Sequence, residues 1–321
     1  MFMRLLAACL VLTAPARAEP LEIASWNIEN LRAEVGVGMV KRTAADFAAL
    51  RAAALALGAD IVALQEVDGP EAAARVFPPE DYAFFFSARN NPQRTGFAVR
   101  RELVVYQNPD LETLGLGGDL RHGADITVDL GGTAIRLLSV HLKSGCWEAP
   151  LTDGDRDCVR LAQQVPALEV WIDARTVEDV PFAVLGDFNR RFDRDEVLAA
   201  SGASLWQEID DGDPAGLDLV RANAGRVSAC EDGRYPDYID HLVLDEQAAA
   251  WIVPDSFEQI LLLAPTPEAA ARLSDHCPIS VVLDPDLAPS EPRTEALSPA
   301  GKVVAWVRSI AEELGITGPK D

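Results

Sequence analysis

The chain has 321 residues, of which 49% are hydrophobic and 25% are charged, and its formal net charge at pH 7 is -23. This balance is typical of a folded globular protein with enough apolar material for a sizeable core. The charge excludes an overall attraction for nucleic acid or anionic membranes, so an anionic substrate would require a metal ion or a local basic patch.

The first 18 residues have the layout of a secretory signal peptide. A short basic start, Met1–Arg4, precedes the apolar stretch Leu5–Ala14 and the small-x-small cleavage site Ala16–Ala18. We therefore expect cleavage before Glu19, a periplasmic or secreted location, and a remaining net charge of about -25. A buried core helix is the alternative interpretation. No later run approaches the ~20 apolar residues of a membrane span, so stable membrane insertion is not expected.

Short apolar segments bounded by Gly, Pro, Asn or Asp predict strands at 21–28, 60–67, 82–88, 96–101, 134–142, 182–188, 237–245 and 279–284. Helical spacing predicts helices over 43–57, ended by Gly58, and over 160–174, where Pro166 should cause a kink or a restart. Strands outnumber helices and do not alternate with them strictly. This order disfavours a doubly wound fold and predicts an α/β (α+β) fold in which two packed sheets have helices outside.

The end of the chain differs in composition from the rest. One domain is expected over 19–286, followed by a polar, Pro-rich linker at 287–301 and an amphipathic helix at 302–321. Within the domain, the apolar segment 257–265 ("FEQILLLAP") is expected to be a buried strand, and a membrane-contact loop is the alternative. No oligomeric state is predicted.

Four cysteines remain after removal of the signal peptide. An even number in an oxidising compartment indicates two disulfides, for which three connectivities exist. Cys146 and Cys158 are near neighbours in a loop-like stretch, so we favour Cys146–Cys158 together with Cys230–Cys277. A zinc site is less favoured, because the chain has neither a C-x-x-C motif nor clustered histidines.

Polar residues recur at the ends of the apolar strands, where a rigid sheet can bring side chains together. Any one of them has an ordinary explanation as a turn residue or a hydrogen-bonded core residue. Their combination in strand-end positions instead indicates a functional site. The candidates are Asn27, Glu66, His141, Asp187, Asn189, Asp240, Asp275 and His276.

The motif order "WNIEN … LQEV … VHLKS … GDFN … IDH … SDH" resembles the endonuclease/exonuclease/phosphatase superfamily over residues 21–283. That superfamily includes DNase I-like nucleases, sphingomyelinases and inositol polyphosphate phosphatases. The resemblance implies an exported bacterial-type member with a four-layered sandwich, in which helices flank two central mixed β-sheets.

The resemblance also implies roles for the candidates. Glu66 matches the metal-binding Glu, and Asn27 the Asn that supports metal and phosphate. Asp187 and Asn189 match the pair that positions the attacking water and stabilises the transition state. His276 matches the catalytic His, and Asp240 matches the carboxylate that orients it. Asp275 matches a metal or water ligand, and His141 matches a second His. Abasic-site endonucleases typically have Tyr at the position of His141, which argues against a role in abasic-site repair.

Elementary chemistry leads to the same arrangement. A phosphodiester is anionic and repels hydroxide, so its hydrolysis benefits from a divalent cation on a phosphate oxygen. Glu66, with an oxygen from Asn27 or Asp275, suits Mg²⁺ or Mn²⁺, which prefer hard oxygen ligands. His276 titrates near neutral pH, and Asp240 would fix its tautomer and raise its pKa. Either His276 or Asp187 could take the proton of the attacking water.

Three functions compete at this point. A secreted, metal-dependent nuclease is favoured by the two-His pattern and by Asn91 and Arg94 in the segment 87–97, with Arg191 after "GDFN". Surface salt bridging is the alternative role of these arginines, and binding of nucleic acid would be weak and metal-dependent. A phospholipid (sphingomyelinase-like) or small phosphodiester or phosphomonoester hydrolase is the second function. A non-catalytic binding module is the third, disfavoured because every candidate residue is present.

Overall fold

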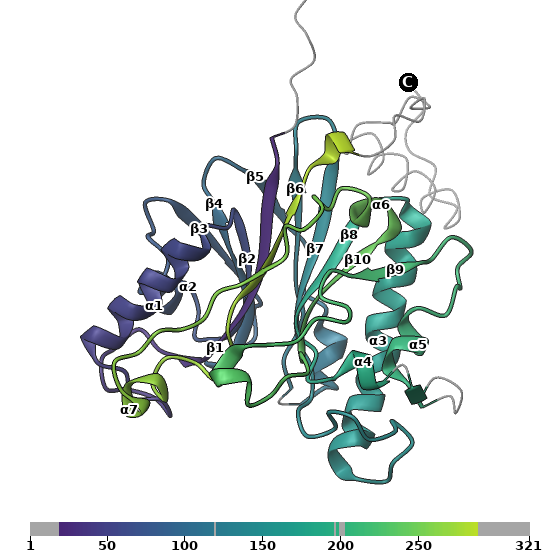
Figure 1. Cartoon of the computed structure of the whole chain (residues 1–321). Helices are drawn as coiled ribbons and strands as arrows, with labels where there is room; N and C mark the ends of the chain where they lie inside the picture. Colours follow the sequence, from purple (N-terminus) through teal and green to yellow (C-terminus); the bar gives the residue numbers. More distant parts are fainter. Residues whose placement is uncertain (1–18, 119, 196, 199–202, 288–321) are drawn as a thin grey trace, which may run out of the picture.

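The computed structural model of the chain describes residues 19–287, apart from 119, 196 and 199–202. The predicted signal peptide (1–18), the C-terminal helix (302–321) and all but the first residue of the linker (287–301) lie outside the described residues. Two six-stranded β-sheets stand side by side, with the long helices on their outer faces (Figure 1). This is the expected sandwich of two mixed sheets flanked by helices.

The first sheet has the strand order β11-β12-β1-β2-β4-β3. Its strands are β1 (Leu21–Leu31), β2 (Ile61–Val67), β3 (Tyr82–Phe86), β4 (Arg94–Arg100), β11 (Glu258–Gln259) and β12 (Ile279–Leu283). The second sheet has the order β5-β6-β7-β8-β10-β9. Its strands are β5 (Val104–Gln107), β6 (Ala124–Asp129), β7 (Ala134–His141), β8 (Phe182–Asp187), β9 (Leu219–Arg221) and β10 (Asp240–Asp245). Each sheet has one parallel pair, β1 with β2 and β7 with β8, and antiparallel pairing elsewhere.

Two long helices cover the outer faces of the sheets (Figure 1). The helix α1 (Ala44–Leu57) begins at a capping box between Thr43 and Asp46 and ends at Gly58, whose φ of 65° suits glycine. The helix α3 (Arg156–Glu178) lies on the other side of the molecule. The short helices are α2 (Pro70–Ala73), α4 (Phe192–Asp195), α5 (Leu205–Ile209), α6 (Glu246–Ala249), α7 (Pro267–Ala270), η1 (Glu112–Gly115), η3 (Cys230–Gly233) and η4 (Pro285–Leu287).

Three clusters of buried side chains follow from this layering. One lies between the sheets, one packs α1 on the first sheet, and one packs α3 on the second. Along β1, for example, Ile23 belongs to the central cluster, whereas Ala24 and Trp26 belong to the α1 cluster. Alternate residues of these strands therefore face opposite layers, and both faces of each sheet are buried.

Several sequence-based expectations need correction. The helix α3 begins at Arg156 rather than 160 and continues through Pro166 as one element instead of restarting there. The strand expected at 237–245 begins only at Asp240. The segment 257–265 is not a buried strand, because only Glu258–Gln259 pair with β12. In this segment Ile260, Leu262 and Ala264 pack on the α1 cluster, whereas Leu263 is 84% exposed.

Candidate active site

The inward-facing rows of the two sheets end in polar side chains at one end of the sandwich. In the second sheet, Asp187 on β8 is the register partner of both His141 on β7 and Asp240 on β10. Residues opposite each other on neighbouring strands project from the same face, so these three side chains lie together. Asn27 on β1 reaches across from the first sheet, and its Nδ2 donates to Asp187 Oδ2 over 3.1 Å.

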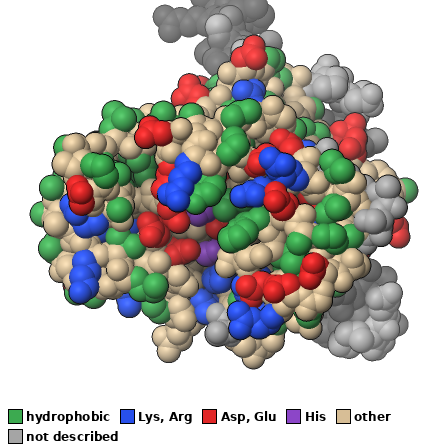
Figure 2. All heavy atoms as spheres, turned by 60° about the horizontal axis from the view of Figure 1, so that its bottom comes forward, with side chains coloured by type: hydrophobic (Ala, Val, Ile, Leu, Met, Phe, Trp, Pro, Cys, Tyr) green, Lys and Arg blue, Asp and Glu red, His purple; other side chains and the backbone are tan. Residues whose placement is uncertain are grey.

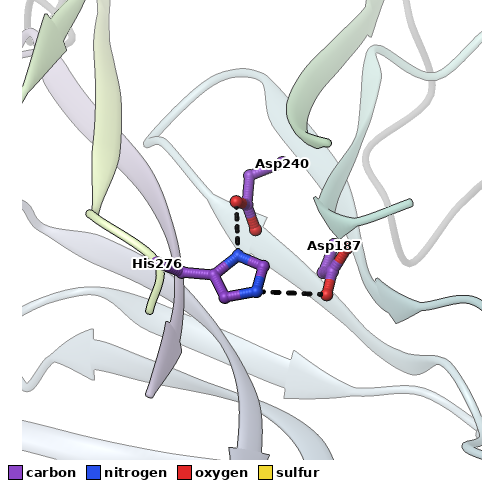
Figure 3. A group of neighbouring side chains, drawn as sticks. All are labelled: Asp187, Asp240 and His276. Atoms are coloured by element: carbon purple, nitrogen blue, oxygen red, sulfur yellow. Dashed lines mark hydrogen bonds and ion pairs between the residues drawn. The ribbon is translucent and has the colours of Figure 1, made fainter. Parts of the chain in front are cut away.

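His276 lies between two of these carboxylates, just before β12 (Figure 3). Its Nδ1 donates to Asp240 Oδ2 over 2.6 Å, and its Nε2 is 3.8 Å from Asp187 Oδ2. One imidazole edge is therefore held by a carboxylate, and the other is directed at the second carboxylate. This is the arrangement of an oriented acid–base histidine.

The charges around His276 set its protonation. Burial lowers the pKa of His276, but the carboxylates of Asp240 and Asp187 outweigh this effect and raise it well above 6.5. Burial raises the pKa of Asp187 to about 7, and Asp240 adds to the rise while His276 opposes it. At neutral pH the geometry thus favours a cationic His276 beside a carboxyl group that can exchange a proton.

His141 has the opposite character. It is 5% exposed, and its Nε2 lies 3.5 Å from Asp187 Oδ2 and 3.8 Å from Glu66 Oε1. Burial, with smaller contributions from Arg121, His276 and Arg89, holds the pKa of His141 well below 6.5. A neutral His141 whose Nε2 faces two carboxylates can act as a hydrogen-bond donor there.

On β2 the inward-facing row ends at Gln65, and Glu66 follows it with a left-handed φ of 59° that interrupts the alternation of the strand. Its Oε2 accepts hydrogen bonds from the backbone N–H of Asn30 over 3.1 Å and from Gln93 Nε2 over 2.9 Å. The contact from Asn27 Nδ2 to its Oε1 is longer, at 3.4 Å. The two bonds to Oε2 fix the carboxylate, and Oε1 is the oxygen that a cation could bind with the least loss of hydrogen bonding.

The two asparagines of the site hold other groups in place. Asn27 Oδ1 accepts the N–H of Glu29 over 3.0 Å, so Asn27 presents its amide nitrogen, not its oxygen, to the carboxylates. In this orientation Asn27 supports the carboxylates through its nitrogen, and its Oδ1 holds the backbone at Glu29. The backbone N–H of Asn189 donates to Asp187 Oδ1 over 2.8 Å, and Asn189 Nδ2 donates to the carbonyl of Leu142 over 3.1 Å.

Asp275 lies at the outer side of this arrangement. Its side chain is 57% exposed, and its Oδ1 is 3.8 Å from His276 Nε2. The neighbouring Glu29 is half-buried; burial and the charge of Asp275 raise its pKa to about 7. Asp275 thus lies where it could bind a cation or a water at the mouth of the site.

Two sets of oxygen and nitrogen donors could hold a metal ion. Ligand atoms of Asp187, Asp240 and His276 lie within 4.8 Å of one another. However, a metal ion bound to His276 Nδ1 would have to replace its 2.6 Å hydrogen bond to Asp240. Glu66 Oε1 offers a hard carboxylate oxygen without that loss, and such an oxygen suits Mg²⁺ or Mn²⁺.

The residues expected to bind substrate differ in how far their side chains are already engaged by other groups of the protein. Arg94 begins β4, and its Nε donates to the carbonyl of Asn91 over 3.3 Å. Arg191 forms an ion pair with Glu148 at 2.9 Å, so part of its charge is already offset. Sequence reasoning missed Gln93, which lies between Asn91 and Arg94 and bonds directly to Glu66. The one signal for Gln93 in the sequence was its place in the segment 87–97, which was expected to bind substrate.

The cysteines pair in the expected way. The S–S distances are 1.98 Å for Cys146–Cys158 and 2.05 Å for Cys230–Cys277. The second pair links the residue after His276 to the segment that leads into Asp240. The bridge therefore connects the two chain segments that carry the hydrogen-bonded pair.

On the surface, histidine side chains lie at the bottom of a hollow, next to acidic side chains (Figure 2). Substrate can therefore approach the site from this end of the sandwich. In the part of the chain that the structure describes, no helix has the length and apolar character needed to cross a membrane.

The geometry agrees with a family model that matches residues 24–276 and describes the endonuclease/exonuclease/phosphatase family. The chain belongs to this family. The match ends at His276 and so includes every candidate residue of the site. Members of the endonuclease/exonuclease/phosphatase family are hydrolases of phosphodiester bonds, and they generally use divalent metal ions.

Solved structures show the same fold at low sequence identity. TDP2 from C. elegans has a TM-score of 0.57 and 18% identity, over 85% of this chain and 78% of that one. D. rerio TDP2 complexed with a single-strand DNA product has a TM-score of 0.52 and 21% identity, over 82% of this chain and 98% of that one. An endonuclease/exonuclease/phosphatase from Bacteroides vulgatus has a TM-score of 0.52 and 18% identity, over 83% of this chain and 98% of that one. No curated protein matches the chain in sequence.

Proposed function

We propose that the chain is an exported, metal-dependent phosphodiesterase whose substrate is nucleic acid. One observation carries the proposal: His276 lies between Asp240 and Asp187, with Glu66 beside them. A buried, oriented histidine together with several carboxylates is expensive to maintain without a function. Hydrolysis of an anionic ester uses each of these groups.

Glu66 would hold Mg²⁺ or Mn²⁺, with Asp275 as a further oxygen donor. The ion supplies positive charge to a phosphate oxygen and so reduces the repulsion between the phosphodiester and the attacking water. Gln93 and Asn30 keep the Glu66 carboxylate in place through their hydrogen bonds to Oε2. This support is the kind that tunes metal affinity in proteins.

The protonation states divide the remaining roles. Asp187 would accept the proton of the attacking water, because burial brings its pKa to about 7. His276 would remain cationic, held by Asp240, and donate a hydrogen bond to the developing negative charge. Neutral His141 and Asn189 would complete the set of groups around the phosphate.

Nucleic acid is the substrate that the surroundings of the site favour. Arg94 and Asn91 lie on the segment that Gln93 connects to Glu66, and such side chains can contact backbone phosphates. A member of the same fold, D. rerio TDP2, has been solved with a single-strand DNA product. The net charge of -23 implies that binding is weak and sensitive to salt.

A phospholipid diester is a second candidate substrate, favoured by one specific feature. In the segment 257–265, Leu261 is 45% exposed and Leu263 is 84% exposed. Exposed leucines of this kind can enter the interface of a membrane without spanning it. The observation concerns one short loop, so we rank this substrate below nucleic acid.

Export rests on the N-terminal sequence pattern together with the two cysteine pairs. Disulfides persist in oxidising compartments and are rare in the cytosol. Their presence is compatible with a periplasmic or secreted protein. Edman sequencing of the exported protein should begin at Glu19, and a chain that retains residues 1–18 would contradict export.

The function can be tested with purified protein and Mg²⁺, Mn²⁺ or EDTA. The substrates are plasmid DNA, RNA, sphingomyelin vesicles and bis-p-nitrophenyl phosphate. We expect metal-dependent cleavage of nucleic acid and of the small diester, and loss of both in EDTA. Cleavage of lipid alone would favour the second candidate. Absence of turnover on all four would contradict both and support a non-catalytic binding module.

A further inference from the structure

Arg42 is a buried arginine outside the residues assigned above. It is 2% exposed and follows the exposed segment 34–41. Its Nη2 donates to the carbonyls of Ile28 (3.0 Å), Glu29 (2.8 Å) and Leu273, and its Nη1 donates to the carbonyl of Asn30 (3.3 Å). A single guanidinium thus connects two segments that are more than 200 residues apart in the chain.

The first of these segments is a strained turn at the end of β1. Glu29 and Asn30 have left-handed φ angles of 35° and 54°, which cost free energy for residues other than glycine. Such a conformation persists only where the surroundings enforce it. Here the carbonyls of the turn converge on Arg42, and the N–H of Asn30 is thereby directed at Glu66 Oε2.

The second segment leads into the catalytic histidine. Leu273 precedes Ser274, whose Oγ donates to the carbonyl of Asn27 over 2.8 Å and accepts the N–H of His276 over 3.1 Å. Asp275 lies between these two residues. By holding the carbonyl of Leu273, Arg42 fixes the distance between this segment and the strained turn.

The charge of Arg42 is suited to this place. Burial lowers the pKa of Arg42 to about 10, opposed by the carboxylates of Glu29, Asp46, Asp275 and Glu66. The guanidinium therefore stays cationic at neutral pH, although its four hydrogen bonds all go to carbonyl groups. Its charge offsets part of the repulsion among the carboxylates on the metal side of the site.

We infer that Arg42 is a positioning residue that sets the spacing of Glu66 and Asp275 for the metal ion. The inference rests on the proposed function, because it concerns the same metal site. Lysine cannot replace the arginine, since an ammonium group lacks the planar fork that reaches four carbonyls in two segments. The loss of a supporting residue of this kind typically weakens metal binding by ~10–100-fold.

The test compares Arg42→Lys with the unmodified protein in Mn²⁺ titrations followed by calorimetry and by electron paramagnetic resonance. We expect the dissociation constant for Mn²⁺ to rise by ~10–100-fold. Arg175→Lys is the matched control, because Arg175 is also buried but lies on α3 and pairs with Glu178. A merely structural role would lower the melting temperature in EDTA and leave Mn²⁺ affinity unchanged.

The outcomes separate the inference from the function on which it rests. If the unmodified protein binds Mn²⁺ and Arg42→Lys binds it equally well, the inference is wrong and the function stands. If the unmodified protein neither binds Mn²⁺ nor hydrolyses a diester, the proposed function fails and the inference falls with it.

A second measurement covers the case in which Arg42→Lys does not fold. Hydrogen exchange of the unmodified protein should show the amides of Asn30 and His276 slowing together on addition of Mn²⁺, because Arg42 couples their segments. Protection confined to one of the two segments would overturn the inference.

Discussion

Asp187 and Asp240 are register partners on β8 and β10, so their two carboxylates project side by side from the same face of the sheet. Two such carboxylates repel each other in a buried place, and His276 lies against both. The histidine is therefore at once the partner of one carboxylate and the compensating charge for the other.

Replacing His276 by Ala should remove the group that stabilises charge on the phosphate. We expect turnover of bis-p-nitrophenyl phosphate to fall by ~10²–10³-fold, the range for loss of a donor to a developing negative charge. Initial rates at saturating Mg²⁺ measure the effect, and circular dichroism checks that the variant is folded. A folded variant with nearly unmodified turnover would contradict the role of His276.

The pH dependence should report the pairing with Asp240. Asp240→Asn keeps an oxygen that accepts from Nδ1 but removes the charge that raises the pKa of His276 above 6.5. If cationic His276 is required, the loss of kcat/KM with rising pH should move to lower pH in this variant. A profile whose alkaline side stays in place would show that the titration belongs to another group.

The same pair has a predictable effect on stability. A histidine whose pKa is raised on folding contributes stability fully below its unfolded pKa and loses it as pH rises through the folded pKa. Asp240→Asn should therefore lower the melting temperature more at pH values below 6.5 than at alkaline pH. Equal destabilisation across the pH range, measured by calorimetry, would argue against a cationic partner.

The two disulfides should differ in their effect on catalysis. Replacing either pair by Ser should cost about 3 to 4 kcal/mol of stability from loop entropy. Only Cys230→Ser/Cys277→Ser should also lower kcat, because that bridge joins the segments of His276 and Asp240. Cys146→Ser/Cys158→Ser is the control. Its loop should stay in place without the disulfide, because Arg190 also donates hydrogen bonds to the carbonyls of Cys146 and Ala149. Equal losses of kcat in the two double variants would refute this difference.

Binding of nucleic acid should depend on Arg94. Arg94→Gln should raise KM for an oligonucleotide several-fold and reduce the slope of log affinity against log salt by about 1. Turnover of the small diester should not change. Arg100→Gln is the matched control, because Arg100 lies at the opposite end of the same strand and stacks on Tyr82. The same response in both variants would exclude a specific phosphate contact at Arg94.

Much of the fold and site could be predicted because the signals were local. Apolar runs marked most of the buried strands, and polar residues at their ends marked Asn27, Glu66, Asp187 and Asp240. The buried strand β6 was not predicted, because polar residues alternate with its apolar ones. The cysteine pairing followed from spacing and compartment. Each of these features can be recognised from a short stretch of sequence alone.

The remainder depends on contacts that the sequence does not display. The edge strand β5 was missed because Val104 and Tyr106 are exposed and the strand is short. The segment 257–265 has the composition of a buried strand, but its alternate leucines point to solvent. Arg42 has no local pattern at all, because its four acceptors are backbone carbonyls brought together by the fold.

Asn27, His141, Asp187 and Asp240 are the last members of the same inward-facing rows that build the core between the sheets. A change in how the sheets pack would displace them, so the chemistry is constrained together with folding. The segment 34–41 is mostly exposed and adds little to that core. It can therefore diverge in length and sequence at small cost, and one scaffold can acquire new substrates while its hydrolytic centre stays unchanged.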